Sequence, residues 1–126
     1  MTRRVLVVDD DPTIVKMVKR LLASEGYEVT TAESPLGVSS LVRRIDPEVI
    51  ILDVMMPGLS GESLAKLIKK VAERRPLIFY SAMAEDELLA LTRRVPDSTY
   101  VAKGSPLAEL VTTVDRMMRL YASQRP

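Results

Sequence analysis

The sequence predicts an α/β fold in which five parallel β-strands alternate with five α-helices. Short, continuous apolar runs recur along the chain, and stretches with apolar residues three or four positions apart lie between them. Proline residues preceded by Asp or Ser separate several of these segments. Because parallel strands need long crossover connections, this alternation predicts a sheet that is covered by helices on both faces.

The composition is that of one globular domain. The chain has 126 residues, of which 47% are hydrophobic, and its 18 basic and 17 acidic residues leave a formal charge of only +1. This near-balance argues against a nucleic-acid clamp. The chain contains no Cys and no His, which excludes disulfides, zinc–thiolate sites and imidazole catalysis. Any bound metal must therefore be held through oxygen atoms.

Three apolar runs, at residues 5–8, 49–52 and 77–80, predict strands that are buried on both faces of the sheet. Two shorter strands are expected at residues 27–31 and 99–102. Right-handed crossovers leave few ways to connect five such strands. We predict a doubly wound, flavodoxin-like sheet with the strand order 2-1-3-4-5.

Apolar residues at helical spacing predict helices within residues 14–22, 36–45, 64–71, 88–91 and 107–118. Three helices are expected to begin with a capping side chain before a first-turn proline: Asp11-Pro12, Ser34-Pro35 and Ser105-Pro106. Gly26 is placed to end the first helix. Met117 and Met118 are expected to pack in the core.

We expect a single domain over residues 1–121, followed by a short polar tail at residues 122–126 and by no output domain. The apolar run after Arg3-Arg4 is too short for a signal peptide, and no run approaches a membrane span. We therefore expect a cytoplasmic protein without a membrane partner. Basic residues near the C-terminus are interpreted as a solvated face, so that direct nucleic-acid binding is not expected: Arg93, Arg94, Arg116 and Arg119.

Polar side chains stand at the carboxyl ends of four predicted strands, which meet at one edge of the sheet and form the usual ligand site of such folds. In chain order they are Asp9-Asp10-Asp11, Asp53, Ser81 and Lys103. A helix cap explains Asp11, whereas Asp9 and Asp10 have no such role. Adjacent carboxylates would repel by roughly 4 kcal/mol per pair at ~4 Å and an effective dielectric near 20, so a cation is needed to hold them together.

These residue types predict phosphoryl-transfer chemistry. Oxygen ligands with an open outer side favour Mg²⁺, which shares its remaining positions with water and a phosphate group. Lys103 supplies a positive charge and Ser81 a hydroxyl donor for oxygens of the same anion. A carboxylate nucleophile needs no general base, because it is already ionised at neutral pH.

Four sequence motifs occur in this order: Val7-Val8-Asp9-Asp10, Leu52-Asp53-Val54-Met55-Met56-Pro57-Gly58, Ser81-Ala82 and Lys103. In this combination the chain resembles the receiver domain of two-component response regulators over essentially its whole length. The resemblance implies a signalling domain, not an enzyme, that promotes its own phosphorylation and dephosphorylation. It also implies a monomer or weak dimer whose output partner or output domain is unknown.

The resemblance assigns the phosphoacceptor and the metal ligands. Asp53 would accept a phosphoryl group from a histidine kinase or a phosphotransfer protein. Asp10, Asp53 and the backbone carbonyl of Met55 would bind Mg²⁺ directly, and Asp9 would bind it through a water molecule.

The remaining site residues are also implied by the resemblance. Ser81 and Lys103 would bind phosphoryl oxygens, and Ala82 would keep the neighbouring loop small. Tyr100 falls at the position of the family's switch aromatic. Movement of Ser81 would open space for it and change the surface formed by the predicted helix at residues 88–91, the strand at 99–102 and the helix at 107–118. Met55 and Met83 would flank the approach of the water that hydrolyses the phosphoryl group, where polar residues accompany faster dephosphorylation in the family.

The sequence departs from the family pattern in two places. Proline usually follows the active-site Lys directly, whereas Gly104 and Ser105 precede Pro106 here. The segment Val95-Pro96-Asp97-Ser98 replaces the usual Gly-Ala-Asp before the switch aromatic. We expect Lys103 to be held less rigidly and this surface to be rebuilt locally.

Two other functions remain open from the sequence. The segment Val8-Asp9-Asp10-Asp11-Pro12-Thr13 also fits the DxDxT opening of haloacid-dehalogenase-like phosphatases, with Ser81 and Lys103 as later motifs. That alternative leaves Asp53 without a role. The other is a receiver-like interaction module that works without phosphorylation.

Overall fold

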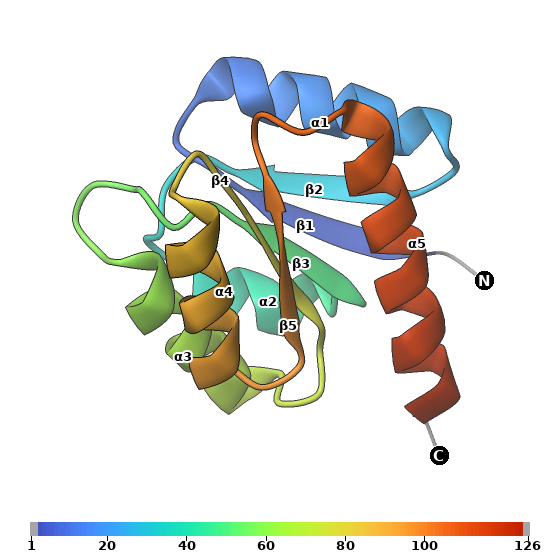
Figure 1. Ribbon diagram of the computed structural model, residues 1–126. Helices are drawn as coiled ribbons and strands as arrows, with labels where there is room; N and C mark the ends of the chain where they lie inside the picture. Colours follow the sequence, from blue (N-terminus) through green and yellow to red (C-terminus); the bar gives the residue numbers. More distant parts are fainter. Residues whose placement is uncertain (1–2, 125–126) are drawn as a thin grey trace.

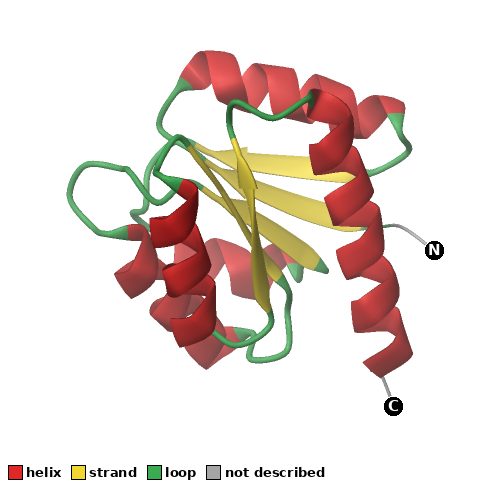
Figure 2. Ribbon diagram, in the orientation of Figure 1, coloured by secondary structure: helices red, strands yellow, loops and turns green. Residues whose placement is uncertain are grey.

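The computed structural model describes residues 3–124, which form a five-stranded parallel sheet with helices on both faces (Figure 1 and Figure 2). The strand order is β2-β1-β3-β4-β5, which confirms the predicted topology. Along the chain the elements are β1 Arg4–Val8, α1 Pro12–Ser24, β2 Glu28–Ala32, α2 Val38–Ile45, β3 Val49–Leu52, α3 Gly61–Val71, β4 Leu77–Ser81, α4 Glu85–Arg94, β5 Ser98–Ala102 and α5 Leu107–Gln124.

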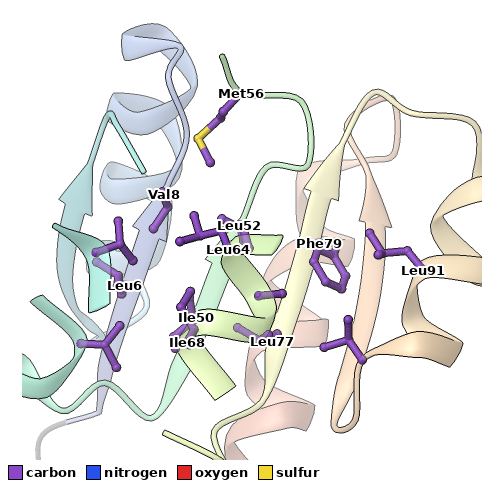
Figure 3. Packing of buried hydrophobic residues seen from close by; sticks show 14 of the residues in the cluster. Leu6, Val8, Ile50, Leu52, Met56, Leu64, Ile68, Leu77, Phe79 and Leu91 are labelled. Atoms are coloured by element: carbon purple, nitrogen blue, oxygen red, sulfur yellow. The ribbon is translucent and has the colours of Figure 1, made fainter. Parts of the chain in front are cut away.

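Two apolar layers pack against the sheet, and alternate strand residues belong to each of them. Ile50, Leu52 and Phe79 face α2, α3 and α4, as Figure 3 shows for part of this cluster. Ile51 and Tyr80 belong to the other layer, which α1 and α5 cover. Because successive side chains of a strand point to opposite faces, strands buried on both sides must be apolar at every position. This explains the continuous apolar runs.

The strand register brings the carboxyl ends of the central strands to one level. Val8 of β1 pairs with Leu52 of β3, and Ser81 of β4 pairs with Ala102 of β5. The predicted strands agree with the observed ones to within one residue at each end, and β4 includes Ser81 itself. The first polar residues after β1, β3 and β5 therefore emerge side by side.

The ends of α1 form as the sequence predicts. The Asp11 carboxylate accepts a hydrogen bond from the Thr13 N–H at 2.9 Å, and Pro12 is the first helical residue. Gly26 adopts a positive φ of 91° directly after the cap residue Glu25, a conformation that favours glycine.

The predicted starts of the other two proline-led helices are wrong. α2 begins at Val38, because the Ser34 hydroxyl accepts the Leu36 N–H at 3.1 Å in a local turn and Gly37 then enters the helix with a positive φ. Leu36 is consequently 88% exposed instead of contributing to the core. α5 begins at Leu107, so Pro106 precedes the helix instead of lying in its first turn.

The C-terminal helix is longer than the sequence indicates. α5 extends to Gln124 and so includes the first residues of the predicted tail at 122–126, while residues 125–126 lie outside the described part of the chain. Met117 and Met118 are buried against the sheet, as predicted. Within residues 3–124, no helix combines the length and the hydropathy needed to span a membrane.

We predict that Gly61→Ala destabilises the protein although alanine is normally favoured in a helix by about 1 kcal/mol. A Cβ atom at Gly61 would lie 2.5 Å from the Val54 Cα, so the backbone of the β3–α3 loop would have to move. The expected loss is about 1–3 kcal/mol in the free energy of unfolding, measured by urea denaturation. Gly104→Ala is the matched control because its Cβ would meet open space, and it should change stability by less than about 0.5 kcal/mol. Equal effects of the two substitutions would contradict the crowding at Gly61.

Candidate functional site

Backbone hydrogen bonds extend the sheet by one residue beyond β1, β3 and β5 and thereby fix the first residue of each following loop. They join the Asp9 N–H to the Ala32 carbonyl (3.1 Å), the Asp53 N–H to the Val8 carbonyl (3.0 Å) and the Lys103 N–H to the Ser81 carbonyl (2.9 Å). Strand alternation assigns Asp9, Asp53 and Lys103 to the sheet face that α1 and α5 cover. The site is therefore held by the sheet, beside the β3–α3 loop that projects in green in Figure 1.

Three carboxylates meet at this edge, as the sequence predicts. Asp9, Asp10 and Asp53 each offer one oxygen, and these three oxygens lie within 4.8 Å of one another. Asp9 and Asp53 are buried, whereas Asp10 is exposed. The donor set is hard, anionic and open on one side, which fits a divalent cation such as Mg²⁺.

Lys103 already neutralises part of this charge. Its ammonium lies 2.8 Å from Asp9 Oδ2 and 3.2 Å from Asp53 Oδ2. The sequence predicts that these acids need a nearby cation, and the Lys103 ammonium supplies part of that positive charge. Sequence reasoning assigned Lys103 only to phosphate oxygens, because the spacing of residues does not reveal which strand-end groups its side chain reaches.

Burial and the neighbouring charges shift the pKa values of Asp9 and Lys103 in opposite directions. Burial raises the pKa of Asp9, and the hydrogen bonds from Lys103 and the Asp11 N–H offset only part of that effect. Burial alone would lower the pKa of Lys103, but Asp9 and Asp53 together raise it. Lys103 therefore remains charged at neutral pH, and the ionised form of Asp9 is disfavoured by burial.

The second oxygen of each buried carboxylate is held by the backbone. Asp9 Oδ1 accepts the Asp11 N–H at 3.0 Å, and Asp53 Oδ1 accepts the Met55 N–H at 3.1 Å. The N-cap of α1 is Asp11 and not Asp9, as the sequence predicts, but the Asp9 side chain also shapes the turn into α1. Both carboxylates are oriented before any ligand arrives.

The other predicted site residues differ in their burial and their contacts. Ser81 is fully buried, and its hydroxyl oxygen accepts the Met83 N–H at 3.2 Å. Ala82 is exposed, and the Met55 side chain is 59% exposed. Met83 is half-buried against the core cluster that contains Phe79. Met55 and Met83 thus differ in burial, and Met83 is the less exposed of the two.

Tyr100 lies away from the carboxylates, on the other face of the sheet. It is half-buried, pairs in register with Phe79 and packs against the same core cluster as Met83. Ser81 also belongs to this face, because it lies two residues after Phe79 on β4. Ser81 and Tyr100 therefore share one side of the β4–β5 pair.

Sequence reasoning missed Tyr80. Its ring is buried under Lys103, whose ammonium lies over the ring at 6.0 Å from the centroid. Burial raises the pKa of the Tyr80 phenol, which is therefore neutral. The alternation of side chains along the strands could have indicated this contact, because it assigns Tyr80 and Lys103 to the same face of neighbouring strands.

The family model described as the response regulator receiver domain matches residues 5–115 of the chain. The chain is also similar to a probable transcriptional regulatory protein, TcrX, of Mycobacterium tuberculosis, with 33% identity over 117 residues. This match includes 91% of the chain but 49% of the relative, so the chain spans about half the length of that protein.

Two solved structures show the same architecture. The receiver domain of the Francisella response regulator 1452 is 28% identical, with a TM-score of 0.84, and the match covers 94% of this chain and 98% of that one. The Vibrio cholerae chemotaxis protein CheY4 is 26% identical, with a TM-score of 0.85 and coverage of 93% and 99%. With its fold, its strand-end residues and its match over residues 5–115, the chain belongs to the receiver domains of two-component response regulators.

Proposed function

We propose that residues 1–121 act as a phospho-accepting unit in which Asp53 receives a phosphoryl group from a histidine kinase or a phosphotransfer protein. The observation that carries this proposal is the Asp53 carboxylate, buried and oriented by the Met55 N–H beside two further acids and Lys103. A cytoplasmic location follows from the proposed donor, whose phosphoryl group comes from ATP. The output partner acts through the surface of α4, β5 and α5.

Mg²⁺ is the proposed cofactor. The carboxylates of Asp10 and Asp53 and the backbone carbonyl of Met55 would hold it directly, and Asp9 would do so through a water molecule. When bound, Mg²⁺ supplies positive charge that offsets the repulsion between these acids and an incoming phosphate.

The chain's own groups account for the transfer step. An Asp53 carboxylate oxygen forms a bond to phosphorus while the P–N bond of the phosphohistidine breaks, and the imidazole leaves with the electron pair. Lys103 then donates to a phosphoryl oxygen instead of to Asp53. The Ser81 hydroxyl accepts one hydrogen bond and retains its own proton for another phosphoryl oxygen.

The signal would pass from Ser81 to Tyr100. Ser81 lies on the same sheet face as Tyr100, and Tyr100 and Met83 pack against one apolar cluster. If Ser81 moves toward a phosphoryl group, the half-buried Tyr100 ring can occupy the space left behind. This change would alter the surface formed by α4, β5 and α5.

We predict that Mg²⁺ and acetyl phosphate together add one phosphoryl group, on Asp53, as measured by intact mass and peptide mapping. Asp53→Asn and removal of Mg²⁺ by a chelator should each abolish the addition, because the nucleophile or the charge compensation is lost. Asp86→Asn, an exposed change on α4, should leave it intact. A phosphoryl group on Asp9 would support the phosphatase alternative, and no labelling at all would support the phosphorylation-independent module.

We also predict that Asp9→Asn and Asp10→Asn raise the melting temperature in chelator while weakening Mg²⁺ binding. The Asp9→Asn side chain keeps an acceptor for the Asp11 N–H and removes a buried charge whose pKa is raised by burial, so the folded state gains stability at neutral pH. The expected rise is roughly 2–5 °C, corresponding to about 1 kcal/mol.

Asp11→Asn is the matched control for this prediction. It removes the same formal charge from the same loop but keeps a good helix cap, so it should leave Mg²⁺ affinity near that of the parent. Calorimetric titration with Mg²⁺ and thermal unfolding in chelator measure the two effects. If both neutralised variants melt below the parent, the acids stabilise the fold and the repulsion argument is wrong.

Finally, we predict that phosphoryl-Asp53 decays slowly, because both residues flanking the approach of water are methionines. Thioethers accept hydrogen bonds weakly and can neither orient nor deprotonate a water molecule. Met55→Asn combined with Met83→Glu should shorten the lifetime while phosphorylation persists. The decay of purified phosphoprotein is followed at equal Mg²⁺ without kinase, with each single variant alongside. Decay of the parent as fast as that of the double variant would show that these side chains do not control the water.

A further inference from the structure

The side-chain contacts of Lys103 are made by its charged ammonium group. Its backbone N–H donates a hydrogen bond to the Ser81 carbonyl, but the next residue is the exposed Gly104, where an added Cβ atom would meet nothing within 4 Å. The ammonium itself contacts the carboxylates of Asp9 and Asp53. Both of these partners are also proposed phosphate or metal ligands, so their hold on Lys103 must weaken during the reaction.

The contact between the Lys103 ammonium and the Tyr80 ring would remain when Asp9 and Asp53 bind other ligands. Tyr80 is 3% exposed within the α1–α5 layer, and the Lys103 ammonium lies over its ring, 6.0 Å from the ring centroid. The face of an aromatic ring attracts a cation without binding Mg²⁺ or competing for phosphoryl oxygens. The phenol is buried and neutral, so it adds no charge to the site.

We propose that Tyr80 is a positioning residue for Lys103, whose ring keeps the ammonium beside Asp53 while its carboxylate partners are taken by other ligands. The role follows from three observations: the ring belongs to the buried core, it lies on the same face as Lys103 and under its ammonium, and the residue after Lys103 is an exposed glycine with free space around its Cα. This inference rests on the proposed phosphorylation of Asp53.

The contact can be tested without any phosphorylation. In protein carrying ¹³C-labelled lysine, the ε-protons of Lys103, assigned by comparison with Lys103→Ala, should be shifted upfield by the ring. Tyr80→Phe should retain this ring-current shift, and Tyr80→Leu should abolish it. An ε-proton shift that is the same in the parent and in Tyr80→Leu would overturn the proposed contact.

The role in the reaction is tested by a double-mutant cycle with acetyl phosphate as donor. Tyr80→Leu should lower the maximal phosphorylation rate roughly three- to tenfold, with little change in the half-saturating donor concentration, and Tyr80→Phe should restore most of the rate. In a Lys103→Ala background, Tyr80→Leu should have no further effect. Phe79→Leu, a similar aromatic loss on the opposite face of β4, controls for reduced core packing.

The outcomes separate this inference from the proposed function. If the parent labels on Asp53 but Tyr80→Leu slows the reaction equally with and without Lys103, or no more than Phe79→Leu does, the ring is merely structural and only the positioning role fails. If the parent accepts no phosphoryl group, the proposed function fails, and with it the role of Tyr80 in the reaction. The ring-current measurement then still decides whether the contact exists.

Discussion

The ion pairs that join Lys103 to Asp9 and Asp53 are the interactions on which the rest of the site depends. Two carboxylates that are almost fully buried at adjacent strand ends would repel each other strongly without a nearby cation. The Lys103 ammonium lies within 3.2 Å of both, and backbone N–H groups hold the second oxygen of each. In the proposed phosphorylation, an incoming phosphate would have to attract this same cation away. One side chain would then contribute to both the stability and the reactivity of the site.

Parallel sheet topology explains why these charges meet at all. β3, β4 and the part of β1 after Arg4 are buried on both faces, and they contain no charged side chain before their carboxyl ends. The register aligns Val8 with Leu52 and Ser81 with Ala102, and the polar residues begin at that level. The helices that connect the strands cover both faces of the sheet and keep solvent away from these faces. The carboxyl-terminal edge of the sheet, where Asp10 is exposed, remains accessible to a ligand or partner.

Much of this could be predicted from sequence because it depends on residue type and period alone. The apolar runs predict the strands, and Asp53 follows the central one. The start of α2 could not be predicted in this way, because the Ser34 hydroxyl bonds within its own turn and Gly37 adopts a positive φ, so that a local competition decides where the helix begins. The ion pair between Lys103 and Asp9 and the contact between Lys103 and the Tyr80 ring depend on how far side chains extend from one strand to another. Such distances follow from register and burial, which the sequence does not specify.

The sheet separates the charged groups from the groups proposed to report on them. Asp9, Asp53 and Lys103 continue the alternation of the face covered by α1 and α5, whereas Ser81 and Tyr100 belong to the face covered by α2, α3 and α4. In the proposed mechanism, a change of charge at Asp53 would reach the second face through a residue at the strand end that lies close to both the phosphate position and the core. Ser81 is the residue proposed for this role: it is fully buried, ends β4 and has a short hydroxyl side chain. Because this position is fully buried, a larger side chain there would have to displace neighbouring core atoms.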